Sequence, residues 1–269
     1  MAKINILDFG YVEFIEHWGS DESIITSARM STDKGFNGWG GSICTTCDKE
    51  ERLDPKDYLF KNYDSQEKAR SCKECNGTGK TQGDEKLLKH LYTNKHMTPF
   101  EMGGLVIEVK APIFVFREWH RHRVFSFNEM SARYIPLPDE NYIPTIDRLM
   151  SGANTATTNK QAQGNGKILT EPDALEWLAA LADVYDHAQS VYQLGISLGV
   201  PKELARLPVP VARYSRMRAS ANLRNWLGFL TLRQAPQAQW EIRVYADVVA
   251  SILIARFPRT MELFQNSEA

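Results

Sequence analysis

The most informative stretch of this chain reads RHRVFSFNEMSAR and spans residues 121–133. Three arginines, a histidine, a carboxylate and three small polar side chains fall within these thirteen residues. A guanidinium group stays charged at any physiological pH and can hold a phosphate through two parallel hydrogen bonds. The stretch therefore predicts a site for a phosphorylated, planar ligand. The alternative is a solvated face on which Glu129 and Arg133 form an ordinary helical ion pair.

The overall composition is that of a globular protein, with 43% hydrophobic and 24% charged residues in a chain of 269. A chain of this length can build one large core, or a domain with an insertion. Its net charge of −1 argues against a general nucleic-acid coat or an anionic membrane surface as the main partner. The N-terminal residues do not resemble a signal peptide, and no stretch approaches the ~20 apolar residues of a membrane span. We therefore expect a cytoplasmic protein whose cysteines stay reduced.

A second basic segment lies at residues 202–224. It contains one anion, Glu203, and six cations, which are Lys202, Arg206, Arg213, Arg216, Arg218 and Arg224. We expect this segment to converge with the first one on a single anionic ligand.

The four cysteines form two pairs of identical spacing, Cys44-x-x-Cys47 and Cys72-x-x-Cys75. Two thiolates separated by two residues can bind one metal ion from the same turn, and two such turns complete a four-cysteine zinc site. The gap between the two pairs is slightly longer than in most four-cysteine zinc sites. The alternatives to zinc are an iron centre, redox dithiols or plain surface thiols. Zinc with four thiolate ligands has no open coordination position, so its role would be structural.

The cysteines lie in a segment whose composition differs from the rest of the chain. Residues 37–83 are rich in Lys, Glu, Asp and small residues, which cannot bury much apolar surface on their own. We therefore predict a single domain over residues 1–269 with an inserted metal-binding segment at 37–83. Residues 151–167 are rich in Gly, Asn, Thr and Gln without periodicity, which predicts a flexible loop.

The remaining sequence predicts strands early in the chain and helices late. Short strands are expected at residues 3–8, 11–15 and 105–110, and a helix at 22–30. Pro112 is suited to begin a helix that runs toward the arginine motif. Two later segments have apolar residues at the spacing of one face of a helix. The first contains Leu175, Leu178, Ala182 and Tyr185 and is preceded by the helix start signals Thr170 and Pro172. The second contains Ile242, Tyr245, Val249 and Ile252. This order indicates an α+β architecture.

Residues 96–101 read HMTPFE and form a second motif. Thr98 and Glu101 have the spacing of a capping box, with proline at the first helical position. The segment also resembles the HxTPFEH motif of the flavin-dependent thymidylate synthases, except that Met102 stands in place of the last histidine. The arginine motif resembles that family's signature RHRxxSxNExSxR, in which every fixed position is filled here.

The resemblance extends along most of the chain. Similar segments are residues 4–10, ARMS at 28–31, VPKELAR at 200–206, and the region from 222 to 241 that ends in AQWE. The resemblance implies an α+β fold with an antiparallel sheet and a largely helical C-terminal half. It also implies a homotetramer with active sites shared between subunits.

The resemblance further implies methylation of dUMP at C5 to give dTMP. Methylenetetrahydrofolate would supply the carbon, and NADPH would supply the reducing equivalents through FAD. The cysteine pattern agrees, because a thymidylate synthase that works without flavin needs a cysteine nucleophile and every cysteine here sits in a metal-type pair. Electrostatics and the flavin would therefore activate the ring.

The resemblance assigns roles to individual residues. Arg233 would stabilise negative charge on the uracil ring, and His96 would lie near the flavin ring. The nucleotide would contact Glu118, Arg121, Ser131, Arg133, Arg206 and Arg233. FAD would contact Ser31, Thr98, Arg121, His122, Arg123, Glu129, Asn222, Arg224 and the position of Gly228.

Two residues depart from the family pattern. Gly228 replaces a flavin-contacting asparagine, which removes one hydrogen bond worth ~1 kcal/mol. Glu118 replaces glutamine, and a carboxylate can accept but cannot donate, so it would prefer a donor on the ligand or a neighbouring arginine. The substitution leaves open C5 hydroxymethylation, or a different pyrimidine nucleotide as the substrate. An alternative of another class is a zinc-ribbon protein that binds nucleic acid, which the near-neutral charge disfavours.

Overall fold

The structure is a computed structural model that describes residues 3–40, 83–153 and 169–268. The chain divides into two compact units, one formed by residues 1–17 and 104–253 and the other by residues 18–103 and 254–269. The four cysteines and most of the predicted loop at 151–167 lie outside the described residues.

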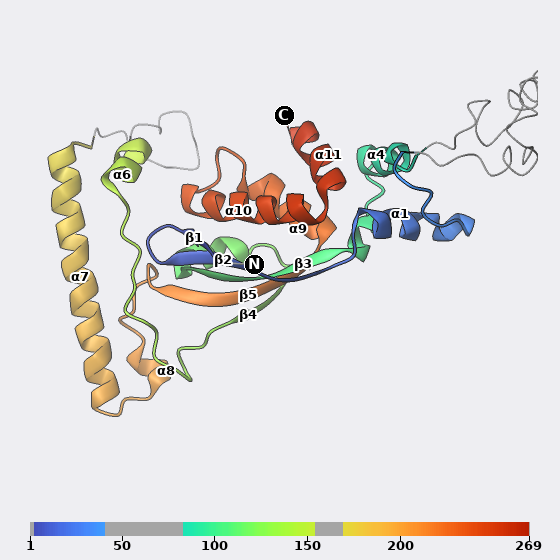
Figure 1. Cartoon of the computed structure of the whole chain (residues 1–269). Coiled ribbons are helices and arrows are strands. Elements are labelled where there is room, and N and C mark those ends of the chain that lie inside the picture. The colour runs from blue at the N-terminus through green and yellow to red at the C-terminus, as the bar shows by residue number, and fades with distance from the viewer. Residues whose placement is uncertain (1–2, 41–82, 154–168, 269) are drawn as a thin grey trace, which may run out of the picture. The chain divides into compact units, whose positions relative to one another are not determined.

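The first unit is built on a five-stranded sheet with the order β1-β2-β3-β5-β4 (Figure 1). The pairs β1/β2, β3/β5 and β4/β5 are antiparallel. The strands are β1 (Ile4–Ile6), β2 (Gly10–Trp18), β3 (Gly104–Pro112), β4 (Ser126–Glu129) and β5 (Tyr214–Asn222). Along β5, buried Met217 and Ala219 alternate with exposed Arg216 and Arg218, as expected for a sheet with one buried face. The predicted α+β fold with an antiparallel sheet is confirmed.

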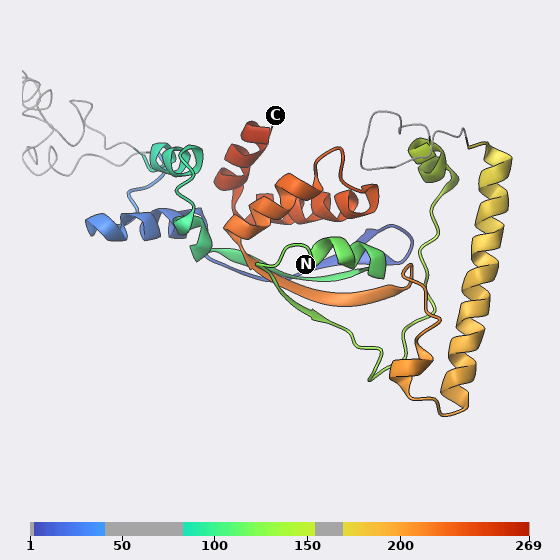
Figure 2. The ribbon, with the colours of Figure 1, turned by 180° about the vertical axis from the view of Figure 1, so that it is seen from behind.

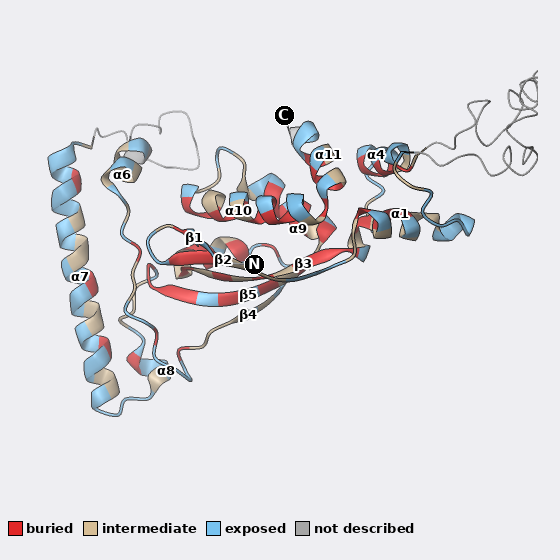
Figure 3. Cartoon of the chain, in the orientation of Figure 1, coloured by how far each residue is buried: buried red, intermediate tan, exposed pale blue. Residues whose placement is uncertain are grey.

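Three helices lie on the buried face of this sheet, α5 (Ile113–Trp119), α9 (Leu223–Arg233) and α10 (Trp240–Arg256) (Figures 1 and 2). Buried residues lie on the strands and on the helix faces toward them (Figure 3). The rings of Trp119 and Phe229 are 4.4 Å apart, and the Trp226 indole donates to the Leu105 carbonyl oxygen at 3.0 Å. This aromatic core joins α5 to α9. Pro112 precedes α5 as predicted.

The stripe predicted for the last long helix is confirmed in α10, where all four of its members are buried; they are Ile242, Tyr245, Val249 and Ile252. Helix α11 (Pro258–Glu268), which follows α10, was not predicted from the sequence. In the part of the chain that the structure describes, no helix is both long and apolar enough to cross a membrane.

The long helix α7 (Glu171–Ser197) begins at the predicted signals, since the Thr170 side chain accepts a hydrogen bond from the Asp173 backbone nitrogen. Two buried tyrosines attach it to the unit. The Tyr185 hydroxyl donates to the Tyr142 carbonyl oxygen at 3.2 Å, and the Tyr192 hydroxyl accepts from a backbone nitrogen at 3.3 Å. Two short helices complete the unit, α6 (Ile146–Ala153) and α8 (Lys202–Ala205). Helix α6 overlaps the first three residues of the predicted loop at 151–167.

The second unit is helical in its described part. Its elements are α1 (Asp21–Arg29), η1 (Met30–Thr32), α4 (Glu85–Thr93), η3 (Thr98–Met102) and α11. The buried carboxylate of Asp21 accepts hydrogen bonds from the Thr260 hydroxyl at 2.6 Å and from the Arg259 backbone nitrogen at 2.9 Å. These bonds join the first turn of α1 to the first turn of α11.

The predicted capping box at Thr98 and Glu101 is wrong. The turn η3 is a 3-10 helix whose N-cap is Met97, without a side-chain cap. Because Thr98 is the first residue of η3, it cannot be the N-cap.

The residues that flank the segment 41–82 are bound to each other. The buried Asp84 carboxylate accepts from the Arg29 guanidinium and, at 2.7 Å, from the Asn37 backbone nitrogen. The Asp84 backbone nitrogen donates to the Gly38 carbonyl oxygen at 3.0 Å. The residues on the two sides of the segment 41–82 therefore lie next to each other, while the predicted insertion itself falls mostly outside the described residues.

Candidate active site

The arginine motif folds as a turn followed by a strand. Residues 120–125 follow α5, and β4 then carries Ser126–Glu129. Glu129 and Arg133 do not share a helix, so their interpretation as a helical ion pair is wrong. Instead, Arg133 Nε donates to the Oε2 of Glu203 on α8 at 3.0 Å.

Arg233, the last residue of α9, is held by two residues from the end of α5 and the turn after it. Its Nε donates to His122 Nε2 at 2.9 Å. Its Nη1 donates to Glu118 Oε2 at 2.5 Å, and its Nη2 donates to the Glu118 carbonyl oxygen at 2.9 Å. The Arg233 side chain is only 14% exposed. This arrangement agrees with the expectation that the Glu118 carboxylate would take a neighbouring arginine as its partner.

The packing of α5 against α9 explains this arrangement. Trp119 follows Glu118 directly and is buried against Phe229 of α9. The His122 ring lies 5.0 Å from the Phe229 ring, and Asn225 Nδ2 of α9 donates to the Val124 carbonyl oxygen at 3.4 Å. The aromatic core therefore fixes the turn of the arginine motif beside the helix that ends in Arg233.

The environment of His122 keeps its imidazole neutral. Burial, together with the nearby Arg233 guanidinium, lowers the pKa of His122 from 6.5 to about 4. At neutral pH its Nε2 is therefore a lone-pair acceptor for Arg233, and its proton sits on Nδ1. His122 thus orients the guanidinium without adding a second positive charge.

The surface around this cluster suits a dinucleotide cofactor. Arg121 and Arg123 are exposed in the turn, and Arg224 is exposed in the first turn of α9. The Asn222 side chain caps α9 by accepting from the Asn225 backbone nitrogen at 3.0 Å. A diphosphate is well matched by guanidinium groups beside a helix N-terminus. The residues present therefore fit FAD.

Gly228 leaves the surface of α9 open. The residue is exposed in the interior of the helix, and a Cβ atom added there would meet nothing within 4 Å. Glycine in a helix interior costs ~1 kcal/mol relative to alanine. The packing of this chain therefore does not require glycine at position 228.

Three of the four residues expected to hold the nucleotide phosphate, Ser131, Arg133 and Arg206, lie around α8. Arg133 binds the Glu203 carboxylate, while Arg206 Nε donates to the Glu203 carbonyl oxygen at 3.4 Å. The Ser131 hydroxyl accepts from the Arg133 backbone nitrogen at 3.3 Å. Lys202 Nζ donates to a backbone carbonyl oxygen of the same loop at 2.8 Å. The structure thus brings Ser131, Arg133 and Arg206 together.

Three of the six cations in residues 202–224, the segment expected to converge with the first one on a single anionic ligand, have contacts within the protein. Arg213 is fully buried and donates to the Pro138 carbonyl oxygen at 2.7 Å, so it is a structural residue. Arg216 and Arg218 lie on the exposed face of the sheet, 3.9 and 3.6 Å from the Glu108 carboxylate. Strand alternation sends them away from the helix-covered face.

Ser31, His96 and Thr98 lie in the second unit, and all three are exposed. Ser31 Oγ donates to the Ala28 carbonyl oxygen at 3.2 Å, and the His96 ring lies 5.8 Å from the ring of His90. Cys44, Cys47, Cys72 and Cys75 lie outside the described residues. Among the residues that are described, no group of three or more His, Cys, Asp and Glu side chains is arranged to hold a metal ion.

Residues 13–259 match the family model described as "Thymidylate synthase complementing protein". The chain belongs to the flavin-dependent thymidylate synthase family. It is 33% identical over 263 residues to a flavin-dependent thymidylate synthase of Thermus thermophilus, covering 98% of this chain and 78% of that protein. It is 32% identical over 262 residues to the enzyme of Thermotoga neapolitana, covering 97% and 94%.

A solved structure supports the same conclusion. A UMP/dUMP methylase from Streptomyces cacaoi, bound with 5-Br dUMP, aligns with a TM-score of 0.70 and 26% identity, covering 98% of this chain and 97% of that one. The chain is therefore a flavin-dependent thymidylate synthase family enzyme, a membership that implies FAD and a dUMP-type nucleotide ligand.

Two contacts of the site were not predicted. His122 was expected at the cofactor, but its Nε2 accepts from Arg233, a residue 111 positions away. Glu203 binds Arg133 across 70 positions. Neither contact leaves a periodic signal in the sequence, because each depends on how distant elements pack.

Proposed function

We propose that the chain methylates dUMP at C5 to give dTMP, with methylenetetrahydrofolate as the carbon donor and NADPH as the reductant. The observation that carries this proposal is the fixed guanidinium of Arg233. Negative charge builds up on the uracil ring as C5 becomes nucleophilic, and a preorganised cation stabilises that charge. Glu118 and His122 hold the Arg233 guanidinium in one orientation through three hydrogen bonds.

The other cations would bind and orient the ligands. Arg121, Ser131, Arg133 and Arg206 would hold the nucleotide, largely through its phosphate. FAD would contact Arg121, His122, Arg123, Glu129, Asn222 and Arg224. We also propose that FAD contacts Ser31, His96 and Thr98, because the family membership favours a cofactor contact at these positions. Bound FAD would pass on the two electrons from NADPH that reduce the transferred carbon to a methyl group.

The experiment is an incubation without oxygen of the flavin-loaded protein with NADPH, methylenetetrahydrofolate and dUMP. Mass spectrometry then identifies the nucleotide product. We expect dTMP, and we expect Arg233→Ala to reduce its formation by at least ~100-fold, as removal of one preorganised charge-stabilising group does. Arg259→Ala is the matched control, because it removes an arginine of the second unit that is paired with Glu85. Unchanged dUMP in a folded, flavin-loaded protein would contradict the proposal.

A second candidate is a related C5 modification, either hydroxymethylation or reaction on another pyrimidine nucleotide. The observation that favours it is the Glu118 carboxylate, which compensates the charge of Arg233. The same incubation separates methylation from hydroxymethylation, because hydroxymethyl-dUMP and dTMP differ in mass. Repeating it with UMP or dCMP in place of dUMP tests for another pyrimidine substrate. The alternative of a zinc-ribbon protein that binds nucleic acid rests on the cysteine pairs and the basic segments. The family membership favours an enzyme over this alternative.

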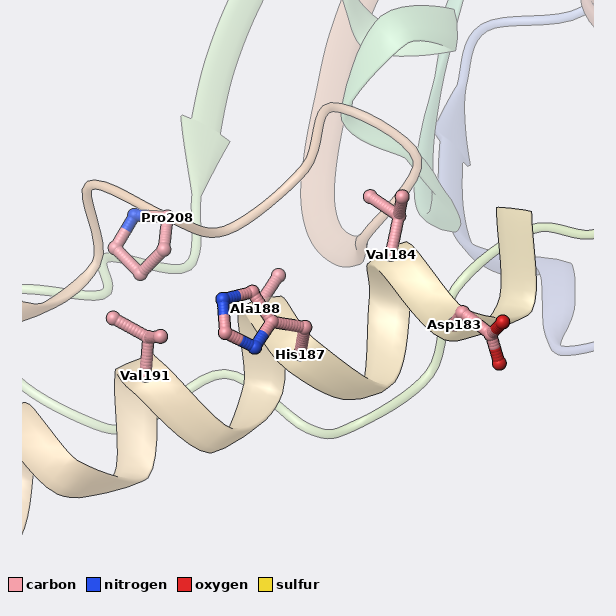
Figure 4. A pocket seen from close by; sticks show the side chains of 6 residues that line it. All are labelled: Asp183, Val184, His187, Ala188, Val191 and Pro208. Carbon is pink, nitrogen blue, oxygen red and sulfur yellow. The ribbon is translucent and has the colours of Figure 1, made fainter. Parts of the chain in front are cut away.

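We also propose that the enzyme is a homotetramer. The 27-residue α7 exposes large apolar side chains along its length, namely Leu175, Trp177, Val184, Val191 and Leu194. A cavity of about 430 Å³ lies beside this helix and is lined in part by Val184, Ala188, Val191 and Pro208. Figure 4 shows these side chains. Burial of such side chains between subunits would contribute ~1.5–3 kcal/mol each when complete.

The four cysteines are proposed to bind one structural zinc ion. The support is the paired spacing in the sequence. Metal analysis of the purified protein tests the proposal, with one zinc per chain expected. Substitution of Cys44 and Cys72 by serine should abolish that zinc content.

A further inference from the structure

The end of helix α4 fixes the backbone of His96. Lys95 N donates to the Tyr92 carbonyl oxygen at 3.1 Å, and His96 N donates to the Leu91 carbonyl oxygen at 2.9 Å. Lys95 has a φ of 58°, which lies in the left-handed region. These two bonds around a left-handed residue form a Schellman motif, in which glycine usually takes that position. His96 therefore leaves the helix in a set direction.

The left-handed backbone at Lys95 is held in place by its surroundings. A lysine disfavours this conformation, because its Cβ atom crowds the following carbonyl oxygen. The Nζ atom of Lys95 lies 5.1 Å from the ring centroid of Tyr92, which is a buried residue. The Tyr92 hydroxyl in turn lies 3.1 Å from Ser267 Oγ of α11, within hydrogen-bond distance. A strained residue that its surroundings hold in place indicates a turn kept for a function.

The side chain of His90, in the last turn of α4, is also fixed. Asn94 Nδ2 donates to the His90 carbonyl oxygen at 2.8 Å and lies 3.1 Å from His90 Nδ1. Because this amide nitrogen is a donor, Nδ1 of His90 is the acceptor, and the proton of the neutral ring lies on Nε2. Both N–H groups of the Asn94 amide therefore hold residue 90.

The His90 ring packs against the ring of His96. Their centroids are 5.8 Å apart and their planes are inclined by 89°, which is edge-to-face geometry. Both histidines are exposed. An exposed histidine without such a neighbour samples several side-chain rotamers. The ring of His90 occupies space that the ring of His96 would otherwise enter, and it therefore limits the orientation of His96.

We propose that His90 is a positioning residue, oriented by Asn94, that holds the imidazole of His96 in the orientation in which it meets the cofactor. This inference rests on the proposed function, in which His96 contacts FAD. A group held in its working orientation lowers the entropic part of the reaction barrier. Because His90 acts only through His96, its effect should disappear when His96 is removed.

The test is a double-mutant cycle in the incubation that measures dTMP formation. His90→Ala should lower kcat by ~2- to 10-fold, the worth of one edge-to-face ring contact, and leave the KM for dUMP unchanged. The double variant His90→Ala with His96→Ala should be no slower than His96→Ala alone, because the two residues act as one unit. Lys89→Ala is the control, since it changes an exposed residue of the same helix, and it should match the wild type.

Two further variants separate the ring contact from a general loss of structure. His90→Phe keeps an aromatic ring and should restore most of the wild-type kcat. His90→Gln keeps an acceptor for Asn94 without a ring and should remain slow. All variants should hold FAD, which is measured by the absorbance of the bound flavin. If His90→Ala does not fold, His90→Gln takes its place in the cycle.

The outcomes separate this inference from the proposed function. Losses that add in the double variant, or a slow His90→Phe, would overturn the role of His90 and leave thymidylate synthesis in place. A wild-type rate in His96→Ala would overturn that role as well, because His90 acts only through His96. No dTMP from the folded, flavin-loaded wild type would overturn the proposed function, and the inference with it.

Discussion

Protonation of His122 should destabilise the protein as the pH falls below neutrality. The folded protein holds the pKa of His122 at about 4, while the ordinary value is 6.5. Between these two pH values, the unfolded chain binds a proton that the folded chain does not bind. Stability therefore rises with pH through this window and is complete above ~6.5. The cause is burial of the ring, together with the Arg233 guanidinium that donates to it.

The structure sets the size of the effect. Each tenfold change in proton affinity corresponds to ~1.4 kcal/mol, so a pKa lowered from 6.5 to about 4 corresponds to at most ~3.5 kcal/mol. Partial contact with solvent screens the interaction and leaves ~2 kcal/mol between pH 7.5 and pH 4.5. His122→Gln is the informative variant, because its amide oxygen can accept from Arg233 Nε and does not titrate.

The assay is urea unfolding of the flavin-free protein at both pH values, followed by tryptophan fluorescence. Trp119 and Trp226 are fully buried in the aromatic core beside His122 and report on its unfolding. All other titrating groups are common to the two proteins, so their contributions cancel in the comparison. The wild type should lose ~2 kcal/mol more than His122→Gln on acidification. An equal loss in both proteins would refute the reasoning.

Three further predictions concern the helices and the insertion. Gly228→Ala should raise the free energy of unfolding by ~0.5–1 kcal/mol in urea melts, because alanine favours the helix and its Cβ has free space; a decrease would contradict this. Replacement of residues 41–82 by a short Gly-Ser linker should preserve flavin binding and the helical circular dichroism, because the flanking residues are already joined through Asp84; an unfolded product would rule out an insertion. Leu194→Lys should dissociate the assembly in light scattering, whereas Asp186→Lys on the same helix should not.

Several elements could be predicted because their patterns are local. The stripe of α10 has one apolar side chain per turn, and Thr170 and Pro172 mark the start of α7. Strand β5 was missed for a physical reason. In β5, exposed Arg216 and Arg218 alternate with buried Met217 and Ala219. The many arginines were interpreted as a ligand-binding surface. The alternation with buried Met217 and Ala219 is the pattern that indicates a strand with one buried face.

The contacts within the candidate site could not be predicted from the sequence. The resemblance assigned Glu118 and Arg233 to the nucleotide and His122 to FAD, but nothing in the sequence shows that these three side chains touch. Their contact depends on the Trp119–Phe229 packing that joins α5 to α9. Packing of this kind joins residues far apart in the sequence, so no short-range pattern encodes it.

The two departures from the family pattern have different relations to the fold. The Glu118 carboxylate is engaged with Arg233 and contributes to holding that helix end in place. Gly228 makes no such contribution, because its position has room for a side chain and the helix would be more stable with one. Nothing in the described structure explains the glycine at position 228. The stability gained in Gly228→Ala would therefore measure the helix propensity that this position gives up, without a loss of packing to offset it.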